Sequence, residues 1–197
     1  MSKQTKIVEL IKKNNGIITG KQLKENNIER EYLSIMNKES KIERVSRGVY
    51  IDPNVFEDNM FNTQYKFKRG VFSHLTALYL HGLSDRTPLK YTMTFPRSYN
   101  TTNAIKLGVN VYRVIENKYN LGIEKCKTNS GNYVSVYSVE RTLCDITRFN
   151  SRVDKEIIIS AYNLYSKRKK KDLNKLYFYA KKFKVYSKVK SYIEVLL

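Results

Sequence analysis

Residues 41–51, KIERVSRGVYI, alternate apolar with charged side chains, and the alternation is interrupted at Ser46, Arg47 and Gly48. A period of two is typical of β-strands, and glycine at the interruption allows a tight turn. The stretch therefore predicts a β-hairpin with a basic tip.

Three short helical segments precede this hairpin. Residues 3–13, 20–26 and 29–39 each place apolar side chains on one helical face, and residues 17–18 form a brief extended stretch after the first. Helix, short strand, two helices and hairpin is the order of a winged helix-turn-helix. A small helical subdomain that contacts other proteins is the alternative interpretation.

In a winged helix-turn-helix the third helix lies in the DNA major groove and the hairpin, or wing, reaches neighbouring phosphates. Ser40 stands where many such proteins have glycine between helix and wing, and a left-handed backbone is less comfortable for serine. The expected DNA-binding residues are Lys21, Arg30, Ser34, Asn37, Lys38, Lys41, Arg44, Ser46 and Arg47.

A domain boundary is predicted at Asp52-Pro53-Asn54, because proline and its polar neighbours favour an extended turn. We expect a winged helix-turn-helix domain at residues 1–53 and a linking segment at 54–70. We expect a second domain at 71–197. Aromatic residues in the linking segment are expected to pack on the second domain.

The second domain reads as a mixed α/β domain with a helical tail, so the whole chain is predicted to be α+β. Alternating or β-rich stretches predict strands, and apolar stretches of helical period predict helices. The expected strands are residues 71–72, 90–95, 109–114, 119–124 and 133–137, and the expected later helices are 139–149, 155–168 and 172–197.

The charge points to a polyanionic partner. The 197 residues include 37 Lys and Arg against 18 Asp and Glu, a net charge of +19, and this excess favours nucleic-acid binding. Part of the lysine content matches the codon bias of an AT-rich genome. The basic run at 167–171 is either a solvated helix end or a second surface that faces a polyanion.

Two cysteines, Cys126 and Cys144, are too few for a disulfide framework or a four-ligand zinc site. They are interpreted as buried thiols. The N-terminus lacks the pattern of a signal peptide, and no apolar run reaches the ~18 residues of a membrane span. We expect a cytoplasmic protein without membrane association.

No common catalytic motif stands out, so no catalytic residue, cofactor or metal is expected. His74 and His81 are seven residues apart, a spacing that favours packing roles over zinc binding. Glu140 and Arg141 are interpreted as a helix start with a local salt bridge.

A metal-dependent nuclease is the alternative function. Asp85 and Glu116 would hold Mg²⁺ in such an enzyme, and Lys118 would position the attacking water. The Glu-x-Lys spelling is short, and it also occurs at residues 39–41.

Three strings in order, IERVSRGVY (residues 42–50), HLTALYLHGLS (74–84) and VYSVERTLCD (136–145), resemble the AbiEi-type antitoxin family of phage abortive-infection systems. The resemblance implies a type IV bacterial toxin-antitoxin system and an antitoxin that represses its own operon by binding inverted repeats in the promoter. Two copies would then occupy one repeat, and a monomer in solution is compatible with this.

The same resemblance implies that the second domain counters a nucleotidyltransferase-like toxin without a stable complex. Residues 71–197 would then suffice for antitoxicity, and residues 1–53 would be dispensable for it. A protein-interaction module that binds the toxin directly is a further alternative.

Overall fold

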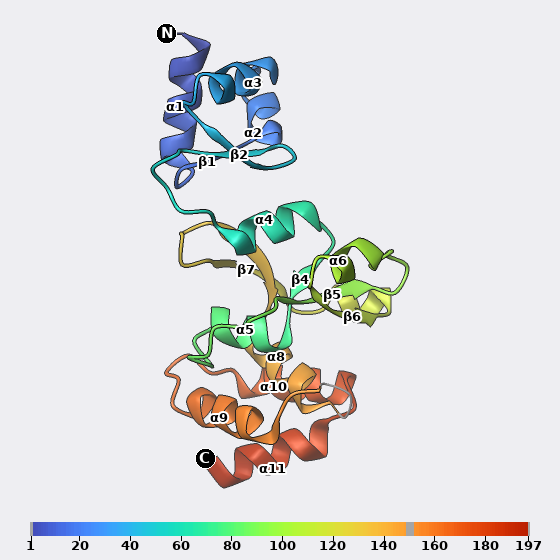
Figure 1. The fold of residues 1–197 in the computed structure, drawn as a ribbon. Coiled ribbons are helices and arrows are strands. Elements are labelled where there is room, and N and C mark those ends of the chain that lie inside the picture. The colour runs from blue at the N-terminus through green and yellow to red at the C-terminus, as the bar shows by residue number, and fades with distance from the viewer. Residues whose placement is uncertain (1, 149–151, 197) are drawn as a thin grey trace. The chain divides into compact units, whose positions relative to one another are not determined.

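A computed structural model describes residues 2–148 and 152–196, which form helices and two β-sheets (Figure 1). The predicted α+β class is confirmed. The chain divides into two compact units, residues 1–66 with 127–133 and residues 67–126 with 134–197. No helix in the described part of the chain has the length and apolar character needed to cross a membrane.

The first unit begins with three helices and a three-stranded sheet. Its elements are α1 (Lys3–Lys13), β1 (Ile17–Thr19), α2 (Gly20–Glu25), α3 (Glu31–Lys38), β2 (Glu43–Ser46), β3 (Val49–Ile51) and α4 (Asn59–Lys66). The sheet order is β1-β3-β2, and both pairings are antiparallel. The predicted helices and hairpin are present, with ends that differ by one or two residues.

Local sequence explains where these helices begin and end. Thr19 and Gln22 form a capping box at the start of α2, so two backbone donors that the helix cannot satisfy find partners. After α3, Ser40 adopts a left-handed backbone with φ of 56°. Ser40 thus adopts the left-handed conformation, which is sterically unfavourable for a residue with a side chain.

The hairpin turns at Gly48, whose φ is 79°. Arg44 pairs with Tyr50 and Ser46 with Val49, so the register shifts between these two pairs. An irregularity of this kind increases the local twist of a strand. Arg47, at the tip of the hairpin, is exposed to solvent.

Helix α4 belongs to the first unit. Phe61 and Tyr65 pack against the buried cluster of Ile17, Val49 and Ile51 on the small sheet. The expectation that the aromatics of the linking segment pack on the second domain is therefore wrong for Phe61 and Tyr65, whereas Phe67 packs edge-on against Phe95 of the second unit. The compact units also differ from the sequence boundaries, because they assign α4 and the turn at 127–133 to the first unit.

The second unit holds a five-stranded sheet in the order β6-β5-β4-β8-β7. The pairings β4-β8 and β5-β6 are parallel, whereas β4-β5 is antiparallel. Its strands are β4 (Val71–Phe72), β5 (Thr92–Pro96), β6 (Asn110–Val114), β7 (Ile123–Lys127) and β8 (Tyr133–Tyr137). Its helices are α5 (His74–Leu80), α6 (Thr102–Lys106), α7 (Glu116–Tyr119), α8 (Val139–Thr147), α9 (Lys155–Ser166), α10 (Leu173–Lys182) and α11 (Tyr186–Leu196).

Two predictions of elements were wrong in this unit. The strand expected at 119–124 is replaced by the end of α7 and the start of β7, because Tyr119 turns inward and its hydroxyl donates to the Arg69 carbonyl at 2.7 Å. The single helix expected at 172–197 is two helices, with a left-handed Lys184 between them at φ of 59°. Residues 149 and 197, the expected ends of two helices, lie outside the described chain.

Helix α8 is the centre of the second unit. All nine residues of Val139–Thr147 are buried. Together with α5, this helix lies between the sheet and the tail helices α9, α10 and α11 (Figure 1). Polar side chains on α8 are therefore removed from water and must find partners inside the protein.

Candidate functional site

The predicted DNA-contacting residues lie mostly on the outside of the first unit. Leu33 and Met36 anchor α3 in the core, so the residues between them face outward. Lys21, Arg30, Ser34, Lys38, Lys41, Arg44 and Arg47 are exposed, whereas Asn37 and Ser46 are half-buried. Most of the set is therefore accessible to a partner.

Some of these side chains already have acidic neighbours. Lys41 pairs with Glu39 at 2.8 Å and donates to the Gln4 side-chain oxygen at 3.2 Å. Lys21 lies 3.5 Å from Glu25 one turn further along α2. Such exposed pairs contribute only about 0 to 1 kcal/mol, so a phosphate can compete for either lysine.

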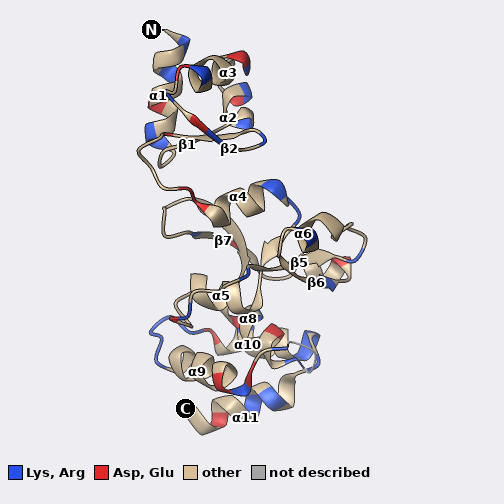
Figure 2. Cartoon of the chain, in the orientation of Figure 1, with Lys and Arg blue, Asp and Glu red and all other residues tan. Residues whose placement is uncertain are grey.

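The two hairpin arginines differ from these lysines. The Nε atom of Arg44 donates to the Ser46 carbonyl at 3.5 Å, a contact within the hairpin itself. In the described chain neither Arg44 nor Arg47 forms an ion pair with a carboxylate. Figure 2 shows basic residues on α2, α3 and β2 interspersed with acidic ones.

Arg30 connects α3 to α2. Its guanidinium lies against Gly20, where an added Cβ atom would come within 3.2 Å of Arg30 Nε. The absence of a side chain at Gly20 therefore allows the arginine to pack across the start of α2. This contact limits how far the exposed Arg30 side chain can reach.

The alternative nuclease residues are held by different neighbours. Glu116 pairs with Arg69 at 2.6 Å, and the Lys118 ammonium lies 5.6 Å from the centre of the Phe183 ring. Asp85 is exposed in the loop after α5. Among the residues with described positions, no group of three or more His, Cys, Asp or Glu side chains is placed to hold a metal ion.

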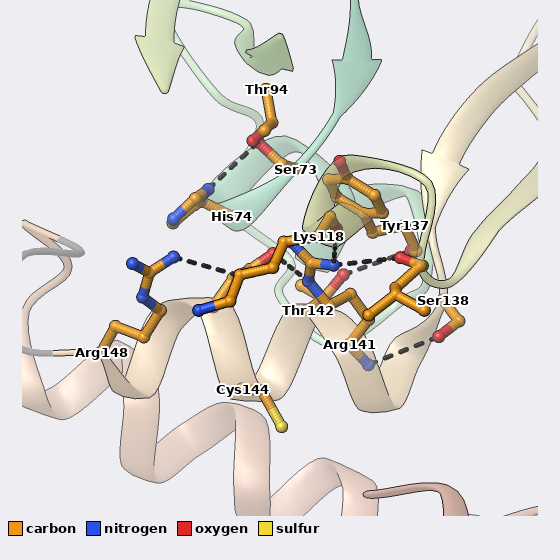
Figure 3. A network of polar contacts seen from close by, with 12 residues as sticks. Ser73, His74, Thr94, Lys118, Tyr137, Ser138, Arg141, Thr142, Cys144 and Arg148 are labelled. Carbon is orange, nitrogen blue, oxygen red and sulfur yellow. Dashed lines mark hydrogen bonds and ion pairs between the residues drawn. The ribbon is translucent and has the colours of Figure 1, made fainter. Parts of the chain in front are cut away.

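The second unit contains a buried charged network centred on Arg141, which is 0% exposed. Its Nε atom donates to Asp145 Oδ2 at 2.8 Å, and its Nη1 atom donates to the Leu121 carbonyl at 3.0 Å. Nη1 also donates to the Lys118 carbonyl at 2.7 Å (Figure 3). The expected local salt bridge between Glu140 and Arg141 is thus wrong. Side chains four residues apart share a helix face and adjacent ones do not, so Arg141 reaches Asp145.

Two aromatic rings sandwich the same guanidinium. Its central carbon lies 3.8 Å from the Phe183 ring centre and 4.3 Å from that of Tyr137. Planar guanidinium groups stack well on aromatic faces, and this helps to compensate for lost hydration. Arg141 therefore joins α8 to Phe183 at the end of α10 and to the carbonyls of Lys118 and Leu121 at the end of α7 and just after it. These contacts give the residue a structural role.

The Glu140 side chain contacts the tail helices instead of Arg141. One of its carboxylate oxygens lies 3.5 Å from the Lys175 ammonium, and the other accepts from the Tyr165 hydroxyl at 3.5 Å. Burial raises the pKa of the Tyr165 hydroxyl, so the tyrosine stays protonated as a donor. The pair joins α8 to the tail helices.

The two histidines occupy different environments. His81 caps the end of α5, and its Nε2 atom donates to the Tyr137 carbonyl at 2.7 Å. His74 is buried at the start of α5, where its ring stacks on Tyr112 with 3.7 Å between centres. Its Nδ1 atom is 3.1 Å from the Ser73 hydroxyl, which also accepts from Thr94 (Figure 3).

His74 also lines a cavity of about 400 Å³ together with Thr92, Asn110, Tyr112 and Arg152. Burial lowers the pKa of His74 to about 4, so its ring is neutral at pH 7. No sequence pattern predicts this cavity. Its lining comes from segments up to 79 positions apart, His74 to Val153, which no local pattern brings together.

The cysteines are free thiols. Cys144 is buried on α8, and burial raises the pKa of its thiol above the ordinary range. Cys126 is half-buried, so the interpretation as a buried thiol holds fully for Cys144 alone. A thiol that stays protonated is a poor nucleophile.

Comparison with known proteins shows a fold and no family. No protein-family model matches the chain, and no curated protein matches it. The crystal structure of the RV2827C protein from Mycobacterium tuberculosis superimposes with a TM-score of 0.55 at 12% sequence identity. The match covers 90% of this chain and 70% of that one, so the likeness extends over both units.

Proposed function

We propose that the first unit is a winged helix-turn-helix that binds double-stranded DNA. The observation that carries this proposal is the order of α1, β1, α2, α3 and the β2-β3 hairpin, combined with outward-facing polar residues on α3. In this arrangement α2 supports α3 across a short turn, and α3 enters the major groove. The hairpin reaches the flanking phosphates.

The electrostatics of the hairpin support the same proposal. Arg44 and Arg47 are exposed and carry no carboxylate partner among the described residues, so their charges are available for phosphate oxygens. Arg30, at the N-cap of α3, and Ser34 and Lys38, on its exposed side, supply hydrogen-bond donors. Contacts to phosphates position a protein on DNA, whereas contacts to base edges specify the sequence.

We further propose that the chain is an AbiEi-type antitoxin that represses its own operon and counters a nucleotidyltransferase-like toxin. The support is the three strings at residues 42–50, 74–84 and 136–145. The second string contains all of α5 and the third contains most of α8, the buried helices around which the second unit is built. The apolar residues of these two strings pack in the interior, so a structural role accounts for them.

The test uses the DNA upstream of the gene. Footprinting with the full-length protein is expected to show protection of paired inverted repeats, at concentrations that leave unrelated DNA of equal length unprotected. Co-expression with the product of the adjacent gene is expected to restore growth if that product is toxic. Equal protection of unrelated DNA would contradict the repressor role, and unrelieved toxicity would contradict the antitoxin role.

A further inference from the structure

The second unit has a hollow of about 620 Å³ where the end of α8, the start of α9 and α11 meet. Four basic side chains line it, namely those of Arg148, Arg152, Lys155 and Lys188. Thr147 and Ser191 add hydroxyl groups to the lining, and none of the lining residues is acidic. Segments about 40 positions apart thus contribute to one basic site.

Among the described residues, only Arg148 of these four cations lies near a carboxylate. Arg148 lies 4.0 Å from Asp145, whose other oxygen is already bound by Arg141 at 2.8 Å. Within the described residues, Arg152, Lys155 and Lys188 form no ion pair. Lys190, on the same helix as Lys188, instead pairs with Glu194 at 3.3 Å.

This contrast separates the hollow from an ordinary solvated helix surface. Opposite charges four residues apart stabilise an exposed helix, as Lys190 and Glu194 do. Four like charges around one concave space repel one another, and a bound anion would relieve that repulsion. A concave surface also focuses the positive potential.

The cavity of about 400 Å³ beside His74 adjoins this hollow, because Arg152 and Val153 line both. His74 is 4% exposed, and its Nδ1 atom lies 3.1 Å from the Ser73 hydroxyl. Among the described residues its Nε2 atom has no hydrogen-bond partner, so this nitrogen is the one that a ligand would contact. Its backbone is left-handed, with φ of 49°. Strain of this kind at a non-glycine residue is concentrated at binding and active sites.

We propose that the two adjoining spaces bind a nucleoside triphosphate. Its phosphates would lie among Arg148, Arg152, Lys155 and Lys188, where charge-assisted hydrogen bonds are strong. Its nucleoside would lie beside His74 and Tyr112, where the amide of Asn110 can both donate to and accept from a base edge. This proposal does not depend on DNA binding by the first unit.

Isothermal titration of the full-length protein tests the site, with ATP, GTP, CTP, UTP and inorganic triphosphate as separate ligands in about 150 mM salt. At least one nucleotide is expected to bind more tightly than inorganic triphosphate. The pair Lys155→Gln and Lys188→Gln is expected to weaken that binding at least tenfold. The matched pair Lys169→Gln and Lys170→Gln, in the exposed basic run, removes the same charge and is expected to weaken it less than twofold.

Three outcomes would overturn the proposal. They are no binding of any nucleotide, equal weakening by the two variant pairs, and inorganic triphosphate binding as tightly as every nucleotide. Thermal unfolding of each variant, expected to match the unaltered protein, shows that a lost signal reflects the site. A second variant, Asn110→Ala, is expected to weaken the preferred nucleotide and leave inorganic triphosphate unchanged.

Discussion

His74 is held in its neutral form by its surroundings. Burial is the largest influence and lowers the pKa of the imidazole to about 4. Asp145 acts in the opposite direction, whereas Arg148 and Arg141 reinforce the lowering. A neutral ring can stack on Tyr112 and hydrogen bond with Ser73 without the cost of a buried charge.

Stability should therefore fall as the pH drops from 6.5 to 4. Over this range the unfolded chain binds a proton at His74 and the folded chain does not, so protonation favours unfolding. The lowered pKa of His74 corresponds to a loss of about 3 kcal/mol in the free energy of unfolding between these two pH values. Below pH 4 this residue contributes no further loss. Denaturant unfolding of the unaltered protein and of His74→Asn, at several pH values, measures the effect.

Asparagine is the suitable replacement because it tolerates a left-handed backbone. The difference in unfolding free energy between the two proteins should shrink as the pH falls. Other titrating groups, including His81, cancel in that difference. Two parallel pH profiles would show that His74 titrates normally in the folded protein.

At the scale of helices and strands, local signals were sufficient where the sequence itself provides the ends. Thr19 with Gln22 starts α2, and Ser138 accepts from the Arg141 amide to start α8. Local signals were not sufficient for α7, because the inward orientation of Tyr119 depends on its hydrogen bond to the distant Arg69 carbonyl. The break between α10 and α11 depends on a left-handed Lys184, a residue type with no preference for that conformation.

The start of α4 shows how a distant contact can fix an element. Asp58 Oδ1 accepts from the Phe61 amide at 3.0 Å and so caps the helix. Its Oδ2 accepts from the Thr128 hydroxyl at 2.5 Å and from the side-chain amide nitrogen of Asn132 at 2.9 Å. One buried carboxylate thus ties α4 to the turn at residues 127–133, within the first unit.

Replacing Asp58 with alanine is expected to destabilise the protein by about 3 kcal/mol, because three donors lose their acceptor and two of these are buried side chains. Denaturant unfolding of Asp58→Ala measures this loss. Asp85→Ala, which removes an exposed carboxylate, is the control and should change stability by less than about 0.5 kcal/mol. Equal effects of the two substitutions would contradict the capping role.

At the scale of the whole molecule, the exposed residues of the first unit could be predicted from the sequence better than the buried contacts of the second unit. Exposure of Arg44 and Arg47 follows from hairpin alternation, which is a local pattern. The partner of Arg141 depends on which helix faces are buried, and the basic hollow depends on bringing Lys188 to Lys155. Such sites follow from tertiary packing, and single-sequence patterns do not encode them.

Net charge and the proposed DNA interface make different predictions. The first 53 residues carry 11 basic and 7 acidic side chains, whereas the last 48 carry 13 and 4. If DNA binding simply followed charge, the C-terminal region would dominate it. If the hairpin acts as a wing, removing two arginines from the less basic region should weaken DNA binding more than removing two lysines from the more basic region.

The most direct measurement compares two full-length variants that lose equal charge, Arg44→Ala with Arg47→Ala and Lys169→Ala with Lys170→Ala. Affinity for the upstream DNA is measured by fluorescence anisotropy over a range of salt concentrations. The arginine pair should weaken binding at least tenfold and lower the slope of log affinity against log salt by about 2, one unit for each lost phosphate contact. The lysine pair should leave both nearly unchanged, and a larger loss from the lysine pair, or no loss from the arginine pair, would contradict DNA binding through the hairpin.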